Sequence, residues 1–211
     1  MTVRPAHPLK LYRHALSGHA HRAELLLSLL GLSYELIDVD LASGAHKKPD
    51  FLALNTFGQV PVLDDNGLIV ADSNAILVYL ATKYDDGRWL PRDPASVAAV
   101  QRWLSVAAGQ VASGPAAARL VTVFGAPIDH ARAKTIADGL FAVLQKELEG
   151  RAFLTGNAPT IADIAVYAYV AHAPEGGVSL EPYPAIGAWL SRVAALQGFV
   201  PMKQTRAGLA A

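Results

Sequence analysis

The chain of 211 residues contains no cysteine. Without a thiol, the protein cannot form a disulfide, bind a metal through thiolates or use a cysteine as its nucleophile. The lack of cysteine does not indicate a compartment. Metal or disulfide staples are not needed either, because a chain of this length buries enough apolar surface for a hydrophobic core.

An excess of one charge is also missing, because Lys plus Arg and Asp plus Glu number 18 each. Balanced charge provides no net positive field that would attract phosphate backbones or an anionic membrane. We therefore expect neither nucleic acid nor a membrane as a partner. Charged residues make up 17% of the chain and hydrophobic residues 52%, which is typical of a globular protein and excludes a disordered one.

Long apolar runs are lacking as well. The run near the amino end, from Leu25 to Leu32, is interrupted by Ser28 and Gly31. It is much shorter than the roughly 20 residues of a membrane-spanning helix. No signal peptide is apparent, so we expect a soluble, cytoplasmic protein.

The first part of the chain has the pattern of a mixed α/β unit. Leu9 to Tyr12 and Tyr34 to Val39 read as strands, joined by a helix that stops at Gly31. Further along, a short helix, a hairpin and a longer helix are predicted at 50–54, at 60–71 around Asp65-Asn66-Gly67, and from the cap Asp72-Ser73 onward. The predicted order is βαβαββα.

The rest of the chain is predicted to be helical. Two prolines and a change of pattern coincide in the segment from Trp89 to Pro94, so a linker is expected at 87–93. Asp93-Pro94 begins a helix that Pro115 is expected to end or kink. Asp129 begins another helix, and Thr160 to Asp163 forms a capping box. Pro182 and Pro184 introduce the last helix. Four aromatic residues on these helices are expected to be core residues: Trp103, Tyr167, Tyr169 and Trp189.

Four segments together resemble the glutathione transferase family, nearest its serine-type theta and phi classes. In chain order they are Leu16-Ser17-Gly18-His19, Gly44-Ala45-His46-Lys47-Lys48-Pro49, Asn55-Thr56-Phe57-Gly58-Gln59-Val60-Pro61 and Ala71-Asp72-Ser73-Asn74-Ala75-Ile76. The resemblance implies a thioredoxin-like α/β domain at 1–86 that binds the co-substrate glutathione. It also implies a linker at 87–93 and an all-α domain at 94–211 that holds an electrophile. Detoxification as a homodimer is expected on the same ground.

The resemblance also assigns residues to the two ends of glutathione. The cis proline of Gln59-Val60-Pro61 would leave the backbone of Val60 free to pair with the cysteinyl backbone. At the helix start, Ser73 would donate to the glutamyl carboxylate and Asp72 would accept from the neighbouring ammonium group. The glycyl carboxylate would be bound by His46 and Lys47.

Ser17 is the candidate catalytic residue. Its hydroxyl would donate a hydrogen bond to the glutathione thiolate, helped by the amino end of the following helix. No Gly-x-Ser-x-Gly motif surrounds it, which argues against a serine hydrolase. His14, His19 and His21 crowd the same segment, and one of them is the alternative partner of the thiolate. Their spacing does not match a helical zinc site, so no metal is expected.

Two other functions are consistent with the same residues. Glutathione-dependent reduction of a peroxide or disulfide would need no enzyme cysteine, and a binding or regulatory protein can keep the fold without turnover. The electrophile pocket is expected around 106–119, where Gly109, Ser113 and Gly114 would leave space. The sequence does not identify the electrophile.

Overall fold

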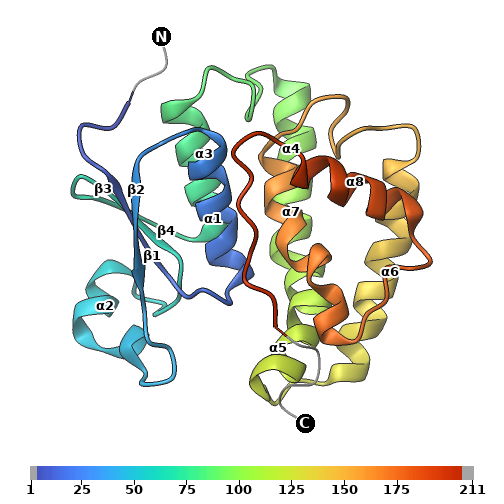
Figure 1. The fold of residues 1–211 in the computed structure, drawn as a ribbon, viewed down its shortest axis with the longest axis horizontal. Helices are drawn as coiled ribbons and strands as arrows, with labels where there is room; N and C mark the ends of the chain where they lie inside the picture. Colours follow the sequence, from blue (N-terminus) through green and yellow to red (C-terminus); the bar gives the residue numbers. More distant parts are fainter. Residues whose placement is uncertain (1–3, 206–211) are drawn as a thin grey trace.

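A computed structural model describes residues 4–205, and a four-stranded mixed sheet organises its first half (Figure 1). The strands are β1 (Leu9–Arg13), β2 (Tyr34–Asp38), β3 (Val62–Asp65) and β4 (Leu68–Ala71), in the order β2-β1-β3-β4. β1 pairs with β2 in parallel and with β3 antiparallel. The predicted strand, helix, strand unit is therefore present, and so is the hairpin.

The hairpin turn follows from two residues that tolerate positive φ. Asp65 pairs with Leu68, so Asn66 and Gly67 form the loop. Their φ angles are 54° and 96°. Asn and Gly are the residues that enter this left-handed region most readily, which is why Asn-Gly is a strong hairpin signal.

Helices cover both faces of the sheet. α1 (Gly18–Leu29) and α3 (Ser73–Tyr84) pack on the face that presents Leu9, Leu11 and Leu63, and they belong to the large core that continues into the helical half. α2 (Pro49–Leu54) follows a short 3₁₀ turn, η1 (Ala45–Lys47). Phe51 of α2 packs with Val62 in a smaller cluster on the opposite face.

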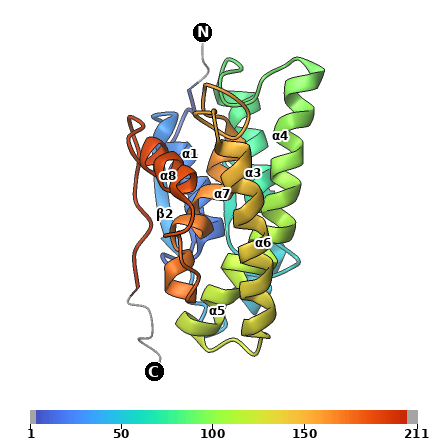
Figure 2. The ribbon, with the colours of Figure 1, turned by 90° about the vertical axis from the view of Figure 1, so that its right-hand side faces the viewer.

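The second half is helical (Figure 2). α3 ends at Tyr84 and the next helix begins at Pro94. The elements are α4 (Pro94–Val106), η2 (Ala107–Ala116), α5 (Ala117–Phe124), α6 (His130–Leu148), α7 (Ile161–Ala171), η3 (Ala173–Gly176) and α8 (Pro184–Ala194). Within residues 4–205, none of the helices has the length and apolar character needed to cross a membrane.

Pro115 does not end the helix, which corrects half of the sequence-based expectation. The chain remains helical through α4, η2 and α5, and η2 is a π-helix. A proline has no N–H to donate, and its ring collides with the carbonyl one turn earlier in a regular α-helix. The wider π-helical turn lets the chain pass Pro115 without leaving the helical path.

The predicted capping box is confirmed at the start of α7. The backbone N–H of Thr160 donates to Oδ2 of Asp163 over 2.9 Å, while the Thr160 side chain caps the helix. The other carboxylate oxygen of Asp163 accepts from the Leu154 N–H and from Nε1 of Trp189, each at 2.9 Å. Burial raises the pKa of Asp163, and these hydrogen bonds oppose the rise. One buried carboxylate thus joins α7, the preceding loop and α8.

The segment after α8 returns along the boundary between the two halves (Figure 1). The Ser28 hydroxyl donates to the carbonyl of Gly198 over 2.6 Å, and a ring nitrogen of His21 bonds the carbonyl of Val200 over 2.8 Å. At Thr205 the segment reaches a buried carboxylate, that of Glu175. The carboxyl-terminal segment therefore fixes α1 to the helical half.

Glu175 is the centre of a buried polar cluster. It accepts hydrogen bonds from Arg119 and His172, each at 2.6 Å, and from Thr205. Burial alone would raise the pKa of Glu175, but the hydrogen bonds from Thr205, His172 and Arg119 outweigh it and lower that pKa to about 2. Arg119 also donates to the carbonyl of Leu16 over 2.8 Å. The cluster thus holds the residue immediately before Ser17.

Replacing Glu175 with Gln should lower the free energy of unfolding at pH 7 by about 3–5 kcal/mol, because Arg119 would stay buried without its carboxylate. The wild-type carboxylate has a folded pKa below its ordinary 4.5. Its stabilisation is therefore present above pH 4.5 and disappears as the pH falls toward 2. Urea unfolding across this range should show the two proteins converging, with Glu149→Gln on the exposed end of α6 as the control. A difference that is constant with pH would contradict the assignment.

Candidate functional site

The strand register brings the predicted site segments to one end of the sheet. β1 and β2 are parallel and end side by side at Arg13 and Asp38. β3 is antiparallel to β1, so it begins beside Tyr12, and β4 ends opposite that same start at Ala71. The segments that leave or enter this edge contain Ser17, His46 and Lys47, Gln59 and Val60, and Asp72 and Ser73.

Ser17 is the N-cap of α1. Its backbone is extended, with φ −89° and ψ 114°, and its Oγ accepts from the N–H of Ala20 over 3.2 Å. A hydroxyl has one proton to donate and two lone pairs that accept. Capping uses a lone pair only and therefore does not use the proton of the half-buried Ser17 hydroxyl.

The ring of Tyr169 packs against Gly18, the residue after Ser17. The sequence did not indicate this contact. A Cβ placed on Gly18 would lie 2.8 Å from Cζ of Tyr169, so only glycine fits there. Burial raises the pKa of Tyr169, while the charge of Arg22 and hydrogen bonding with the His19 backbone and the Ser17 side chain oppose the rise. As expected, Tyr169 is a core residue, and it also packs against the backbone at Gly18, next to Ser17.

The three histidines near Ser17 are neutral groups with structural contacts. Nδ1 of His19 is 2.9 Å from Nη1 of Arg22, and burial together with that charge lowers the pKa of His19 to about 3. His21 donates to Val200, and burial outweighs this bond and lowers the pKa of His21 to about 4. Burial also lowers the pKa of His14. None of them supplies a positive charge near pH 7.

The loop with His46 and Lys47 touches the loop before β3. Nζ of Lys47 donates to the carbonyls of Phe57 and Gly58 over 3.1 and 3.0 Å. Gly58 has φ +57°, and a Cβ there would lie 2.7 Å from the His46 carbonyl oxygen. Nδ1 of His46 is buried and has no hydrogen-bond partner among residues 4–205. The two loops are therefore in close contact, as the shared site requires.

The Val60–Pro61 peptide bond is cis, as predicted. The β-ladder begins only at Val62, so Val60 lies just outside the sheet. Within residues 4–205 its N–H and carbonyl have no backbone hydrogen-bond partner. Asn55 holds the preceding residue by donating to the Gln59 carbonyl over 2.8 Å. An extended ligand can thus pair with the main chain of Val60.

Asp72 caps α3 from an unusual backbone conformation. Its φ is 78°, and its Oδ1 accepts from the N–H groups of Asn74 and Ala75, each at 2.9 Å. Strained backbone of this kind often occurs at functional sites. Ser73 follows as the first residue of the helix and is buried, and its Oγ accepts from Arg22 over 3.2 Å. Arg22 is a second site neighbour that the sequence reasoning missed.

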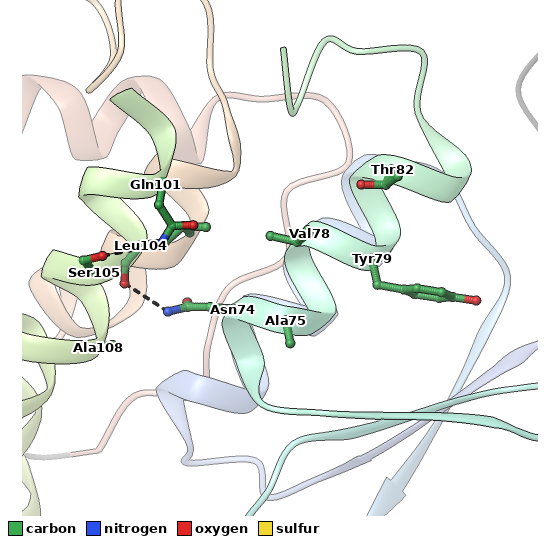
Figure 3. Close-up of a pocket in the computed structure, with 9 residues that line it drawn as sticks. All are labelled: Asn74, Ala75, Val78, Tyr79, Thr82, Gln101, Leu104, Ser105 and Ala108. Atoms are coloured by element: carbon green, nitrogen blue, oxygen red, sulfur yellow. Dashed lines mark hydrogen bonds between the residues drawn. The ribbon is translucent and has the colours of Figure 1, made fainter. Parts of the chain in front are cut away.

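A groove of about 630 Å³ runs between α3 and α4 (Figure 3). Val78 and Leu104 contribute apolar walls, and Nδ2 of Asn74 donates to the Leu104 carbonyl over 3.1 Å. The groove begins next to Ser73 and joins the two halves of the protein.

The glycines expected to open an electrophile pocket differ from one another. A Cβ on Gly114 would lie 3.0 Å from the backbone N of Ala137, so this glycine permits close packing of η2 on α6. The expectation that Gly114 leaves space for a substrate is therefore wrong. A Cβ on Gly109 would meet no neighbouring element within 4 Å, and Ser113 donates to the Gly109 carbonyl over 2.8 Å.

Comparison with known proteins agrees with this arrangement. The family model described as "Glutathione S-transferase, N-terminal domain" matches residues 7–82, and "Glutathione S-transferase, C-terminal domain" matches residues 126–197. Glutathione S-transferase 3 of Zea mays is 35% identical over 205 residues, covering 91% of each chain. Human glutathione S-transferase theta-2 is 30% identical over 200 residues, covering 90% of this chain and 82% of the relative.

Solved structures give the same result. A glutathione S-transferase from Pseudomonas fluorescens superposes with a TM-score of 0.87 at 34% identity, covering 94% of this chain and 100% of that one. A delta-class glutathione transferase from Nilaparvata lugens has a TM-score of 0.81, also at 34% identity, covering 90% of this chain and 91% of that one. With both domain models matched and relatives similar over nearly their whole length, the chain belongs to the glutathione S-transferase family.

Proposed function

We propose that the protein activates the thiol of glutathione for attack on an electrophilic small molecule. The observation that supports this most is the half-buried Ser17 hydroxyl, whose lone pair caps α1 and whose proton is not used by the capping. A thiol with a pKa of about 8.5 is mostly protonated at pH 7, and the thiolate is the nucleophile. A site that favours the anion therefore raises the concentration of the reactive species.

In the proposed reaction the protein forms no covalent bond itself. The thiol proton leaves to solvent, and the thiolate sulfur forms a bond to the electrophilic centre while the leaving group departs with its electron pair. Ser17 donates a hydrogen bond to the sulfur, and the amino end of α1 adds a favourable dipole. The helical half positions the electrophile and limits the access of water.

We assign the two ends of glutathione to opposite sides of Ser17. The main chain of Val60 pairs with the cysteinyl backbone, and Gln59 stands beside it. Asp72 and Ser73 bind the ammonium and carboxylate of the glutamyl end at the start of α3. His46 and Lys47 bind the glycyl carboxylate. In support of this assignment, Nζ of Lys47 donates to the carbonyl of Gly58, so the amine lies beside the loop that contains Gln59 and Val60.

Glutathione-dependent reduction of a peroxide or disulfide is the second candidate for the same site. Assays with an aryl halide, a hydroperoxide and a mixed disulfide distinguish conjugation from reduction. A binding protein without turnover would bind glutathione and be inactive in all three assays. If calorimetry detects no binding of glutathione, the proposed function is excluded. Detoxification and the cytoplasmic location expected from the sequence stay predictions.

We further propose a symmetric homodimer that uses the groove between α3 and α4. The groove is largely apolar, and apolar surface of this kind is usually covered by a partner. Phe57, on the loop before β3, is 78% exposed and is a second apolar feature that a partner copy would cover. Val78 lies in the groove, so it is a suitable position for a test.

Replacing Ser17 with Ala should raise the pKa of the bound thiol by about 1 to 2, because a hydrogen bond to a charged group is worth roughly 1.5–3 kcal/mol. Turnover near pH 7 should fall by about tenfold to a hundredfold and recover partly at alkaline pH. Ultraviolet titration of the bound thiolate measures the shift.

Ser17→Gly separates this role from capping, since glycine caps nearly as well as serine but has no hydroxyl. Ser191→Ala, on the exposed side of α8, serves as the matched control. Unchanged thiol pKa and activity in both Ser17 variants would assign the thiolate to another partner, with His19 and His21 next to test.

Alanine at both His46 and Lys47 should raise the KM for glutathione about tenfold while kcat changes less, because both groups act on a carboxylate remote from the sulfur. Steady-state kinetics with varied glutathione measures both constants, with Lys146→Ala on α6 as the control. Since Lys47 also holds two carbonyls of the neighbouring loop, the single variants are measured as well. An unchanged affinity for glutathione would remove both residues from the site.

Light scattering of the wild type at micromolar concentration should give about twice the chain mass of 22.3 kDa. Val78→Glu should shift the mass toward that of one chain, because a carboxylate buried in an apolar interface is costly. Val143→Glu places the same charge on an exposed position of α6 and should leave the dimer intact. A wild type with the mass of a single chain would refute the homodimer.

A further inference from the structure

Within residues 4–205, Arg22 is a fully buried cation with no carboxylate in hydrogen-bonding contact. The residue is 1% exposed, and its Nε and Nη2 are buried and make no hydrogen bond among residues 4–205. Only Nη1 is engaged, at 3.2 Å from Oγ of Ser73 and 2.9 Å from Nδ1 of His19. An unpaired buried charge is costly, so an anion that compensates it would be bound favourably.

The surroundings of Arg22 do not neutralise this charge. The Tyr169 ring lies below the guanidinium carbon, 5.7 Å from it, and His19 is neutral. Asp72 acts on Arg22 only through its charge, since its Oδ1 caps α3. Burial lowers the pKa of Arg22 to about 10, so the guanidinium is still charged at pH 7.

We propose that Arg22 is a positioning residue for the glutamyl carboxylate of glutathione and that it acts through Ser73. Nη1 donates to Oγ of Ser73, so this oxygen accepts on the side that faces Arg22. The hydroxyl proton of Ser73 therefore points away from Arg22. The carboxylate accepts this proton at the start of α3. It also experiences the positive charge behind the serine.

The geometry excludes direct contact as the main effect. Nε and Nη2 have almost no accessible surface, so a ligand at the sheet edge does not reach them. The charge is felt instead across Ser73 through a medium of low dielectric, where electrostatic interactions are stronger than in water. This inference rests on the proposed function, because it requires glutathione as the ligand.

The test compares two ligands by calorimetry at pH 7: glutathione, and an analogue whose glutamyl unit lacks the α-carboxylate. Arg22→Met should weaken the binding of glutathione by about tenfold to a hundredfold and that of the analogue by less than about threefold. Arg132→Met, on the exposed side of α6, should alter neither. Ser73→Ala combined with Arg22→Met should be no worse for glutathione than the more severe single variant, because both act on one hydrogen-bonded unit.

The outcomes separate this inference from the proposed function. Wild type that does not bind glutathione refutes the proposed function and this inference together. If the wild type binds glutathione but Arg22→Met keeps its affinity, or loses affinity for both ligands equally, only the role of Arg22 is refuted. If the Met variant does not fold, Arg22→Lys is used. It keeps the charge without the planar fork and should show a smaller but still glutathione-selective loss, and an equal loss for both ligands would again refute the role.

Discussion

Helix α1 packs against β1, α3 and α7, and eight of its twelve residues are buried. A helix in this position has few side chains that water can solvate. Its polar residues in the first turns must therefore find partners inside the protein, and His21 and Arg22 do so with the carboxyl-terminal segment and with Ser73. We assign the ligand to the amino end of α1, where the Ser17 hydroxyl is half-buried.

The position of α1 determines how tightly the site is held. Gly18 permits Tyr169 to approach the backbone directly, and Arg119 donates a hydrogen bond to the carbonyl of Leu16. Ser17 lies between these two contacts, and both of them come from the helical half. The helical half therefore does more than pack against the α/β half. It also fixes the backbone on both sides of Ser17, the proposed partner of the thiolate.

Local patterns predicted much of the fold, because the interactions concerned lie within a few residues. The Asn66-Gly67 turn and the capping box at Thr160 need only neighbouring atoms, and both are present. The passage of the helix through Pro115 depends on packing between η2 and α6, which no local pattern contains. The positions of Tyr169 and Arg22 beside the site were not predicted, for a related reason. A tyrosine or arginine in a helix has the same sequence pattern whether or not it lies next to a site. The assigned roles of the glutathione-site residues stay predictions.

The two serines of the proposed site use one principle with different donors. Oγ of Ser17 accepts from the N–H of Ala20, and Oγ of Ser73 accepts from the guanidinium of Arg22. In each case the accepted hydrogen bond occupies a lone pair and does not use the hydroxyl proton, which we propose is donated to the ligand. A neutral backbone donor stands behind Ser17, whereas a full positive charge stands behind Ser73. Under this proposal the stronger field acts on the glutamyl carboxylate, and the weaker dipole of α1 acts on the sulfur, which must remain nucleophilic after it has been stabilised.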